Sequence, residues 1–259
     1  MFDSRFFLLI PAAVSTFIVQ AALLSAPTDD LVSRASGTVV TKCVKPGTAA
    51  LTFDDGPYKY LKQFVDTLDR HNAKGTFFLN GNNWDCIYDA EEVARVKYAF
   101  ERGHQIACHT WAHEDLTTIQ DRRALKKEFT RTLDAIQKIT GSRPAITRPP
   151  YGAYNNMTLS VAKELNQTLV NWDYDTGDAA GASVAASKEI YDTAAAQHHS
   201  TVLVLNHEPY EKTLHEVLPY AIEKLQTAGY QLVTVAECLG MDPYLTVGTA
   251  NIRDKTWKC

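Results

Sequence analysis

The sequence predicts an α/β protein with about seven parallel strands, arranged as a single-domain barrel one strand short of the usual eight. Helical stretches separate short apolar, β-like runs, which are centred near residues 50, 77, 106, 146, 170, 203 and 233. Strands that alternate with helices form a parallel sheet. Titratable residues recur where these runs end, and in a βα barrel those ends meet on the face that carries active sites. An open doubly wound sheet is the alternative, but it would not gather residues from so many strand ends.

The helices are predicted from apolar spacing between these runs. Leu61, Phe64, Val65 and Leu68 recur at the spacing of one helix face, which predicts a helix within residues 58–71. Further helices are predicted at residues 90–102, 121–140, 157–165, 183–197 and 212–228. The strand at 75–79 ends in Asn80-Gly81-Asn82-Asn83, and a strand at 231–235 closes the series.

The N-terminus has the composition of a targeting segment. Arg5 precedes a long apolar stretch that ends in small residues, and residues 1–26 are therefore predicted to be a secretory signal peptide. Cleavage is expected after Ala21 or Ala26, and a retained membrane anchor is the alternative, since the stretch is nearly long enough to span a bilayer. We expect a secreted protein, located outside the cell or in the cell wall, with no stable membrane partner.

The remaining chain divides into three predicted parts. Residues 27–41 are expected to be irregular, residues 42–240 to form the domain, and residues 241–259 to be a C-terminal extension. The sequons at Asn156 and Asn166 predict glycosylation, which is meaningful only in a secretory pathway. The net charge of −4, without a basic cluster, argues against nucleic acid as a partner. We expect a monomer.

The five cysteines are an odd number, so at least one is free or pairs outside the chain. Cys43 lies just before the first predicted strand and Cys238 just after the last. Because the first and last strands of a closed barrel are neighbours, we expect a Cys43–Cys238 disulfide that staples the closure. Cys108 lies inside a predicted strand and is expected to be buried and reduced. Cys86 and Cys259 are the pairing that is left over.

Two adjacent carboxylates, Asp54 and Asp55, follow the apolar run at 49–53 and precede a Gly-Pro turn. Each raises the cost of ionising the other, and a cation beside them removes that cost. A metal ligand next to a general base is therefore one interpretation of the pair. A solvated turn at the surface is the other.

A histidine pair, His109 and His113, follows the predicted strand at 105–108. Residues at i and i+4 share one face of a helical turn. With one carboxylate they form a site with room for water, which is the usual arrangement of catalytic zinc. A structural histidine pair is the alternative. Three more strand ends carry polar groups, in the segments 148–152, 172–178 and 203–208.

These five segments, Thr52–Pro57, His109–His113, Arg148–Gly152, Trp172–Asp178 and Leu203–Glu208, resemble in this order the five motifs of the polysaccharide deacetylase family. This family is carbohydrate esterase family 4, with the NodB homology domain, and the resemblance covers residues 42–239. The motif variants are most similar to those of secreted fungal chitin deacetylases. The resemblance implies a distorted (β/α) barrel and an enzyme that removes N-acetyl groups from N-acetylglucosamine polymers, converting chitin to chitosan and acetate.

The resemblance also implies roles for individual residues. Asp55, His109 and His113 would bind Zn²⁺, although their oxygen and nitrogen donors also admit Co²⁺ or Mn²⁺. Asp54 would be the general base, with a pKa held low by the cation, and Arg148 would orient it.

The remaining roles concern the acid and the walls of the site. His207 would be the general acid, with Asp175 as the first choice of carboxylate partner and Asp178 as the second. Tyr151 would offer its backbone N–H to the oxyanion, and Trp111, between the two histidines, is the best candidate for a site wall. Ala179 stands where the family usually has a tryptophan, and this departure bears on the shape of the acetyl pocket.

Three alternative functions follow from the same residues. An acetyl esterase acting on acetylated xylan would use the same chemistry on an easier bond. A peptidoglycan deacetylase would use it on a different polymer. An inactive glycan-binding protein on this scaffold would have lost the base, the acid or a metal ligand, and all of these residues are present.

Overall fold

The computed structural model describes residues 1–2 and 39–259 of the chain. The predicted signal peptide after residue 2, with its cleavage sites and the alternative of an anchor, lies outside the described residues, as does most of the segment 27–41. Within the described residues, no helix is both long enough and apolar enough to cross a membrane.

A nine-stranded sheet is the centre of the domain, in the order β1-β7-β6-β4-β3-β2-β9-β8, with β10 also paired to β2. Every strand pair in this sheet is parallel, which confirms the predicted α/β class. The strands are β1 (Val39–Val40), β2 (Thr48–Asp54), β3 (Gly75–Leu79), β4 (Gln105–Cys108), β6 (Ile146–Thr147), β7 (Thr168–Val170), β8 (Tyr174–Asp175), β9 (Thr201–His207) and β10 (Gln231–Leu232).

The seven predicted runs all form strands, and β1 and β8 are two further strands of two residues each. Among residues 39–259, no strand pairing joins β1 to β8 at the two ends of the order, so the barrel is open there. The strands β2 and β3 are buried along their whole length, as expected for parallel strands that are covered on both faces. This open sheet matches the expected distorted barrel.

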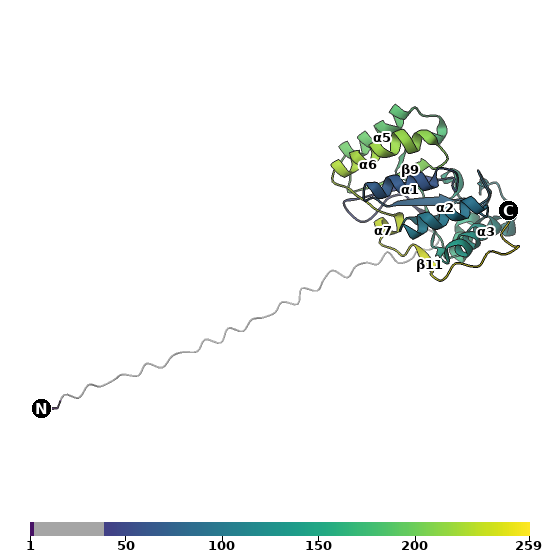
Figure 1. Ribbon diagram of the computed structural model, residues 1–259, viewed down its shortest axis with the longest axis horizontal. Coiled ribbons are helices and arrows are strands. Elements are labelled where there is room, and N and C mark those ends of the chain that lie inside the picture. Colours follow the sequence, from purple (N-terminus) through teal and green to yellow (C-terminus); the bar gives the residue numbers. More distant parts are fainter. Residues whose placement is uncertain (3–38) are drawn as a thin grey trace. The chain divides into compact units, whose positions relative to one another are not determined.

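The helices lie close to their predicted positions, except α7, which was not predicted and begins at Val235, the last residue of the strand expected at 231–235. They are α1 (Leu61–Arg70), α2 (Ala90–Glu101), α3 (Arg122–Thr140), α4 (Asn156–Glu164), α5 (Val184–Ala196), η3 (Thr213–Val217), α6 (Leu218–Thr227) and α7 (Val235–Leu239). Local signals set several of their ends: Asp121 caps α3, and Gly141 ends it at a φ of 82°. Helices α5 and α6 pack side by side, while α2 and α3 pack together elsewhere on the sheet (Figure 1).

Residues 241–259, predicted to be an extension, return to the domain. The strand β11 (Tyr244–Thr246) pairs antiparallel with β5 (Arg143–Pro144). Trp257 is 6% exposed and belongs to the main hydrophobic core. The described part of the predicted irregular segment likewise contains a strand, β1.

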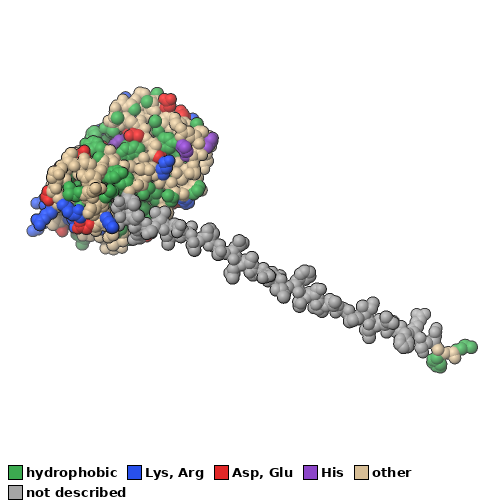
Figure 2. All heavy atoms as spheres, turned by 180° about the vertical axis from the view of Figure 1, so that it is seen from behind, with side chains coloured by type: hydrophobic (Ala, Val, Ile, Leu, Met, Phe, Trp, Pro, Cys, Tyr) green, Lys and Arg blue, Asp and Glu red, His purple; other side chains and the backbone are tan. Residues whose placement is uncertain are grey.

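The expected disulfide Cys43–Cys238 is present, the left-over cysteines Cys86 and Cys259 form a second one, and Cys108 is free and buried. The first bridge connects the segment before β2 to α7, and β10 pairs with β2 as the predicted closure requires. On the face in Figure 2, acidic and basic side chains are mixed.

Candidate active site

One pocket of about 400 Å³ gathers most of the predicted site residues at the carboxyl ends of the strands. Asp54 is the last residue of β2, His207 the last of β9, and His109 directly follows β4. The strand register places Asp54 opposite His207. The pocket is lined by Asp54, Asp55, His109, His113, Tyr151, Trp172, Asp175, Ala179, Ala180, Leu205 and His207.

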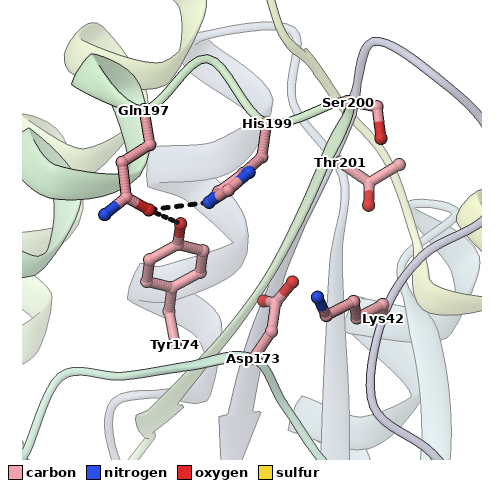
Figure 3. A pocket seen from close by; sticks show the side chains of 7 residues that line it. All are labelled: Lys42, Asp173, Tyr174, Gln197, His199, Ser200 and Thr201. Atoms are coloured by element: carbon pink, nitrogen blue, oxygen red, sulfur yellow. Dashed lines mark hydrogen bonds between the residues drawn. The ribbon is translucent and has the colours of Figure 1, made fainter.

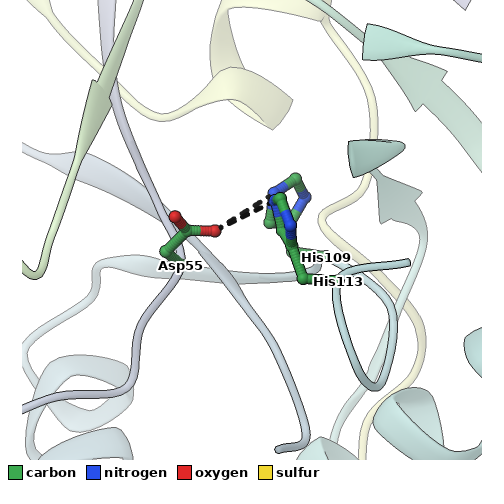
Figure 4. A group of neighbouring side chains, drawn as sticks. All are labelled: Asp55, His109 and His113. Atoms are coloured by element: carbon green, nitrogen blue, oxygen red, sulfur yellow. Dashed lines mark ion pairs between the residues drawn. The ribbon is translucent and has the colours of Figure 1, made fainter. Parts of the chain in front are cut away.

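Asp55, His109 and His113 converge as a possible metal site (Figure 4), with one donor atom from each residue and all three atoms within 4.8 Å of one another. Oδ1 of Asp55 lies 3.2 Å from Nε2 of His113 and 3.6 Å from Nε2 of His109. This oxygen is buried and has no hydrogen-bond partner in the described structure, which is costly unless a cation or water satisfies it. The donor set therefore fits a divalent cation.

The protonation of His109 also suits a metal ligand. Burial, helped by the neighbouring charge of His113, lowers the pKa of His109 to about 3, so its ring is neutral at neutral pH. Its Nδ1 lies 2.8 Å from the backbone oxygen of Arg148. Because a carbonyl oxygen only accepts, Nδ1 carries the proton and donates it. The lone pair of His109 is thus on Nε2, which faces Asp55.

The local structure of the histidine segment differs from the prediction. Residues 109–113 form a non-helical loop, in which Thr110 and His113 have φ of 69° and 55°. The two rings meet edge to face, with centroids 4.9 Å apart. The helical-turn interpretation of the i, i+4 spacing is therefore wrong, although the loop brings both side chains to the same place.

Arg148 holds Asp54 from the interior of the barrel. Both residues are buried, and Nη1 of Arg148 lies 2.7 Å from Oδ1 of Asp54. The other guanidinium donors bond to the Thr52 hydroxyl and to the backbone oxygens of Val170 and Asn171. Burial raises the pKa of Asp54 above its ordinary value, against the lowering effect of the Arg148 charge. This effect opposes the low pKa expected from a nearby cation.

The carboxylate beside His207 is Asp178, which corrects the prediction of Asp175. Nδ1 of His207 lies 2.7 Å from Oδ1 of Asp178, and the His207 backbone N–H donates to Oδ2. Asp175 is exposed, and its carboxylate accepts from the backbone N–H of Gly177. The turn at Gly177, with a φ of 66°, starts the short helix η2 (Asp178–Ala180) and brings Asp178 under the histidine.

Asp178 sets the charge of His207. Burial alone would lower the pKa of the histidine, but the hydrogen bond and charge of Asp178, aided by Asp54 and Asp55, raise it to about 9. Conversely, the contact with His207 and the Thr213 hydroxyl holds the pKa of Asp178 below its usual range, even though burial opposes this. His207 is therefore protonated at neutral pH in the protein chain itself.

Tyr151 and Trp111 have different surroundings. Tyr151 lines the pocket within η1 (Pro150–Gly152), with a φ of 60°, and its exposed ring packs 4.8 Å from that of His113. Trp111 is 4% exposed, and its ring packs against the guanidinium of Arg131 and against Gly81. Trp111 does not line the pocket, so the prediction of a site wall is wrong.

Sequence reasoning did not assign Ala180 or Leu205, which also line the pocket. Ala179, at the position where the resemblance implies a tryptophan, lines the pocket, and so does Trp172. A second pocket, of about 290 Å³, contains none of the predicted site residues (Figure 3). Both sequon asparagines, Asn156 and Asn166, are exposed, and their glycosylation stays a prediction.

Comparison with known proteins agrees with this architecture. The model of the family described as polysaccharide deacetylase matches residues 41–170. A chitin deacetylase of Pestalotiopsis sp. is 36% identical over 79% of this chain and 67% of its own length. A probable peptidoglycan-N-acetylglucosamine deacetylase of Arthroderma benhamiae is 33% identical over 80% of this chain, which spans about half (47%) of that relative.

A solved structure shows the same fold. The chitin deacetylase of the fungal pathogen Colletotrichum lindemuthianum has a TM-score of 0.76 and 30% identity, and the match covers 80% of this chain and 94% of that one. The fold and the site thus define a hydrolase that acts on amide bonds. The chain belongs to the polysaccharide deacetylase family.

Proposed function

We propose that this protein is a metal-dependent chitin deacetylase, which hydrolyses N-acetyl groups of N-acetylglucosamine polymers to give chitosan and acetate. The observation that carries the proposal is the composition of one pocket. A carboxylate-histidine donor set lies between a buried Asp54–Arg148 pair and a His207–Asp178 pair. Relatives that are named chitin deacetylases support the choice of substrate.

Asp55, His109 and His113 would hold the metal, and Zn²⁺ fits their mixed donors, with Co²⁺ or Mn²⁺ as alternatives. When bound, such an ion acts as a Lewis acid and lowers the pKa of water at the site. Asp54 and His207 line the same pocket as these three residues, and the substrate would bind there.

Asp54 would be the general base. Its Oδ1 is held by Arg148, which leaves Oδ2, 3.6 Å from Nε2 of His109, as the atom that takes a proton from the attacking water. Burial strengthens this carboxylate as a base because it raises the pKa. Arg148 fixes the carboxylate in place, so that its lone pair points where water is activated.

His207 would be the general acid. Nδ1 is bound to Asp178, so Nε2 is the atom that donates a proton to the departing amine. An amine must be protonated to leave, and the ion pair with Asp178 keeps the histidine charged for that step. Tyr151, in its left-handed turn beside the metal site, would offer its backbone N–H to the oxyanion.

A peptidoglycan deacetylase is the second candidate, because a relative with that name is 33% identical. Acetate release from N-acetylglucosamine oligomers, peptidoglycan and acetylated xylan separates the candidates. We expect the highest kcat/KM on N-acetylglucosamine oligomers. Preference for peptidoglycan would identify the protein as a peptidoglycan deacetylase, and activity on xylan alone would identify it as an esterase. A lack of turnover on all three would support the inactive glycan-binding alternative.

Secretion is part of the proposal. Two disulfides fit an oxidising compartment, where such bridges persist, and they agree with the predicted signal peptide and sequons. We propose that the protein acts outside the cell or in the cell wall, as a monomer, on insoluble or oligomeric chitin.

A further inference from the structure

The loop that carries both histidines is strained. Thr110 has a φ of 69°, and a β-branched residue is rarely found in that region. His113 also has a positive φ, of 55°. Such residues persist only where the surrounding structure determines the conformation. The contacts around residues 109–113 therefore decide where the histidine side chains point.

Asn80, which directly follows β3, is hydrogen-bonded to the backbone of this loop. Its side chain is buried, and Nδ2 donates to the backbone oxygens of His109 and Thr110 at 2.5 and 3.2 Å. The Asn80 backbone N–H donates to the oxygen of Gly56 at 2.7 Å. One residue thus joins the segment that follows Asp55 to the segment that carries His109.

Glu128, on α3, is hydrogen-bonded to a different part of the loop backbone. Its Oε2 accepts from the backbone N–H groups of Trp111 and Ala112, at 3.1 and 2.9 Å. The backbone of the loop is therefore bound through its oxygens by an amide donor and through its N–H groups by a carboxylate acceptor. These two contacts come from different elements, so neither follows from the local sequence of the loop.

We propose that Asn80 and Glu128 are positioning residues that hold the loop in the conformation in which Nε2 of both His109 and His113 faces Asp55. The inference rests on the proposed function in one respect, that these histidines bind a metal. Neither positioning residue lines the pocket, so both act through the loop.

Asn80 donates hydrogen bonds to the loop and Glu128 accepts them, so isosteric substitutions of these two residues should have unequal effects. Asn80 must donate twice, and an aspartate cannot donate and would face two carbonyl oxygens. Glu128 must accept twice through one oxygen, and the carbonyl oxygen of a glutamine can still do so. Asn80→Asp should therefore disturb the loop strongly, Glu128→Ala should do the same, and Glu128→Gln should keep most of the wild-type behaviour.

Gln167 provides a matched control. It is a buried amide whose Nε2 donates to the backbone oxygens of Pro144 and Leu165, outside the pocket. Gln167→Glu makes the same chemical change as Asn80→Asp. Both variants are expected to lower the melting temperature, so the melting temperature alone does not test the proposal.

The first test measures Co²⁺ affinity and the visible spectrum of the Co²⁺-loaded protein. We expect Asn80→Asp and Glu128→Ala to weaken affinity by about 10- to 100-fold and to change the spectrum, the scale seen when groups that orient metal ligands are lost. Gln167→Glu and Glu128→Gln should leave both close to wild type. An Asn80→Asp protein that is less stable but has unchanged affinity and spectrum would overturn the proposal.

The second test needs no metal. Amide hydrogen exchange of Trp111 and Ala112 in the metal-free protein should be faster in Asn80→Asp and in Glu128→Ala, and unchanged in Gln167→Glu. Unchanged exchange in both loop variants would also overturn the proposal, and either variant suffices if the other does not fold. If the wild type bound no divalent metal but exchange responded as expected, the metal-dependent function would fail while the positioning role stood.

Discussion

The buried pair of Asp54 and Arg148 is a single contact that would serve both stability and chemistry. The guanidinium has four partners and is fully buried, so the carboxylate it holds has one oxygen fixed and one free. The neighbouring Asp55 has a buried oxygen that no hydrogen bond satisfies among the described residues, and this oxygen lies next to both histidines. Adjacent residues of the same type thus have different surroundings, and we propose different tasks for them.

Asp54→Asn should keep the metal and lower the rate of deacetylation by at least about a hundredfold, because an amide cannot take the proton from water. It should also destabilise the fold, since it leaves the Arg148 charge buried without its partner, a loss of about 3–5 kcal/mol. Metal content, urea unfolding and acetate release measured on one preparation separate these effects. Loss of metal in Asp54→Asn with retention in Asp55→Asn would show that the two roles are reversed.

The pH dependence should report His207. Its pKa is raised to about 9, above the ordinary value, so the acid is charged at neutral pH and activity falls as pH rises through the folded-state pKa. A bound cation nearby would place this limb below 9. Asp178→Asn should move the limb to lower pH, because it removes the hydrogen-bonded negative charge.

Asp175→Asn is the matched control for this prediction, since Asp175 is exposed and bonds to Gly177 instead of His207. The pH profile of kcat on N-acetylglucosamine oligomers is the measurement. We expect a clearly larger shift in Asp178→Asn than in Asp175→Asn. Equal shifts, or none in Asp178→Asn, would mean that His207 does not set the alkaline limb.

The choice between these two aspartates shows a limit of sequence reasoning at the residue scale. Asp175 is the last residue of the short strand β8, Asp178 lies three residues further on, and both have the right chemistry. The left-handed Gly177 decides which of them turns under His207, and backbone direction at such a turn has no signature in composition. By contrast, the possible metal site could be predicted, because its three residue types and the strand ends that they follow are visible in the sequence.

At the scale of elements, helices were predictable and loops were not. Apolar spacing and capping residues, such as Asp121 before α3, mark helix boundaries in the sequence itself. The i, i+4 spacing of His109 and His113 in the sequence does not distinguish a helical turn from the loop that the structure contains. The loop conformation depends on partners distant in sequence, Asn80 and Glu128, which periodicity does not reveal.

The C-terminal segment makes a testable contribution to stability. Trp257 is 6% exposed and packs against Tyr88, close to the Cys86–Cys259 bridge. Trp257→Ala should lower the free energy of unfolding by about 3–5 kcal/mol, the range for a large aromatic side chain lost from a core. Urea unfolding measures it, with Trp84→Ala, 44% exposed in the wild type, as the control. A loss in Trp257→Ala no larger than in the control would show that the segment is dispensable.

At the scale of the whole molecule, the seven predicted runs were sufficient to give the parallel sheet and the face that carries the site. The strands β1 and β8, of two residues each, were not among the predicted runs. These two strands are the ends of the sheet order, so the open edge of the barrel could not be derived from the residues alone. The pairing of β10 with β2 explains why the Cys43–Cys238 disulfide was predictable.

We propose that the convergent Asp55, His109 and His113 make this chain a metal-dependent deacetylase. The most direct measurement is acetate release from N-acetylglucosamine oligomers by the purified protein before chelation, after chelator removal of metal, and after addition of Zn²⁺. We expect activity to vanish on chelation and to return with Zn²⁺ in the wild type, but not to return in His109→Ala. Full activity in a preparation shown to be free of metal would contradict the claim.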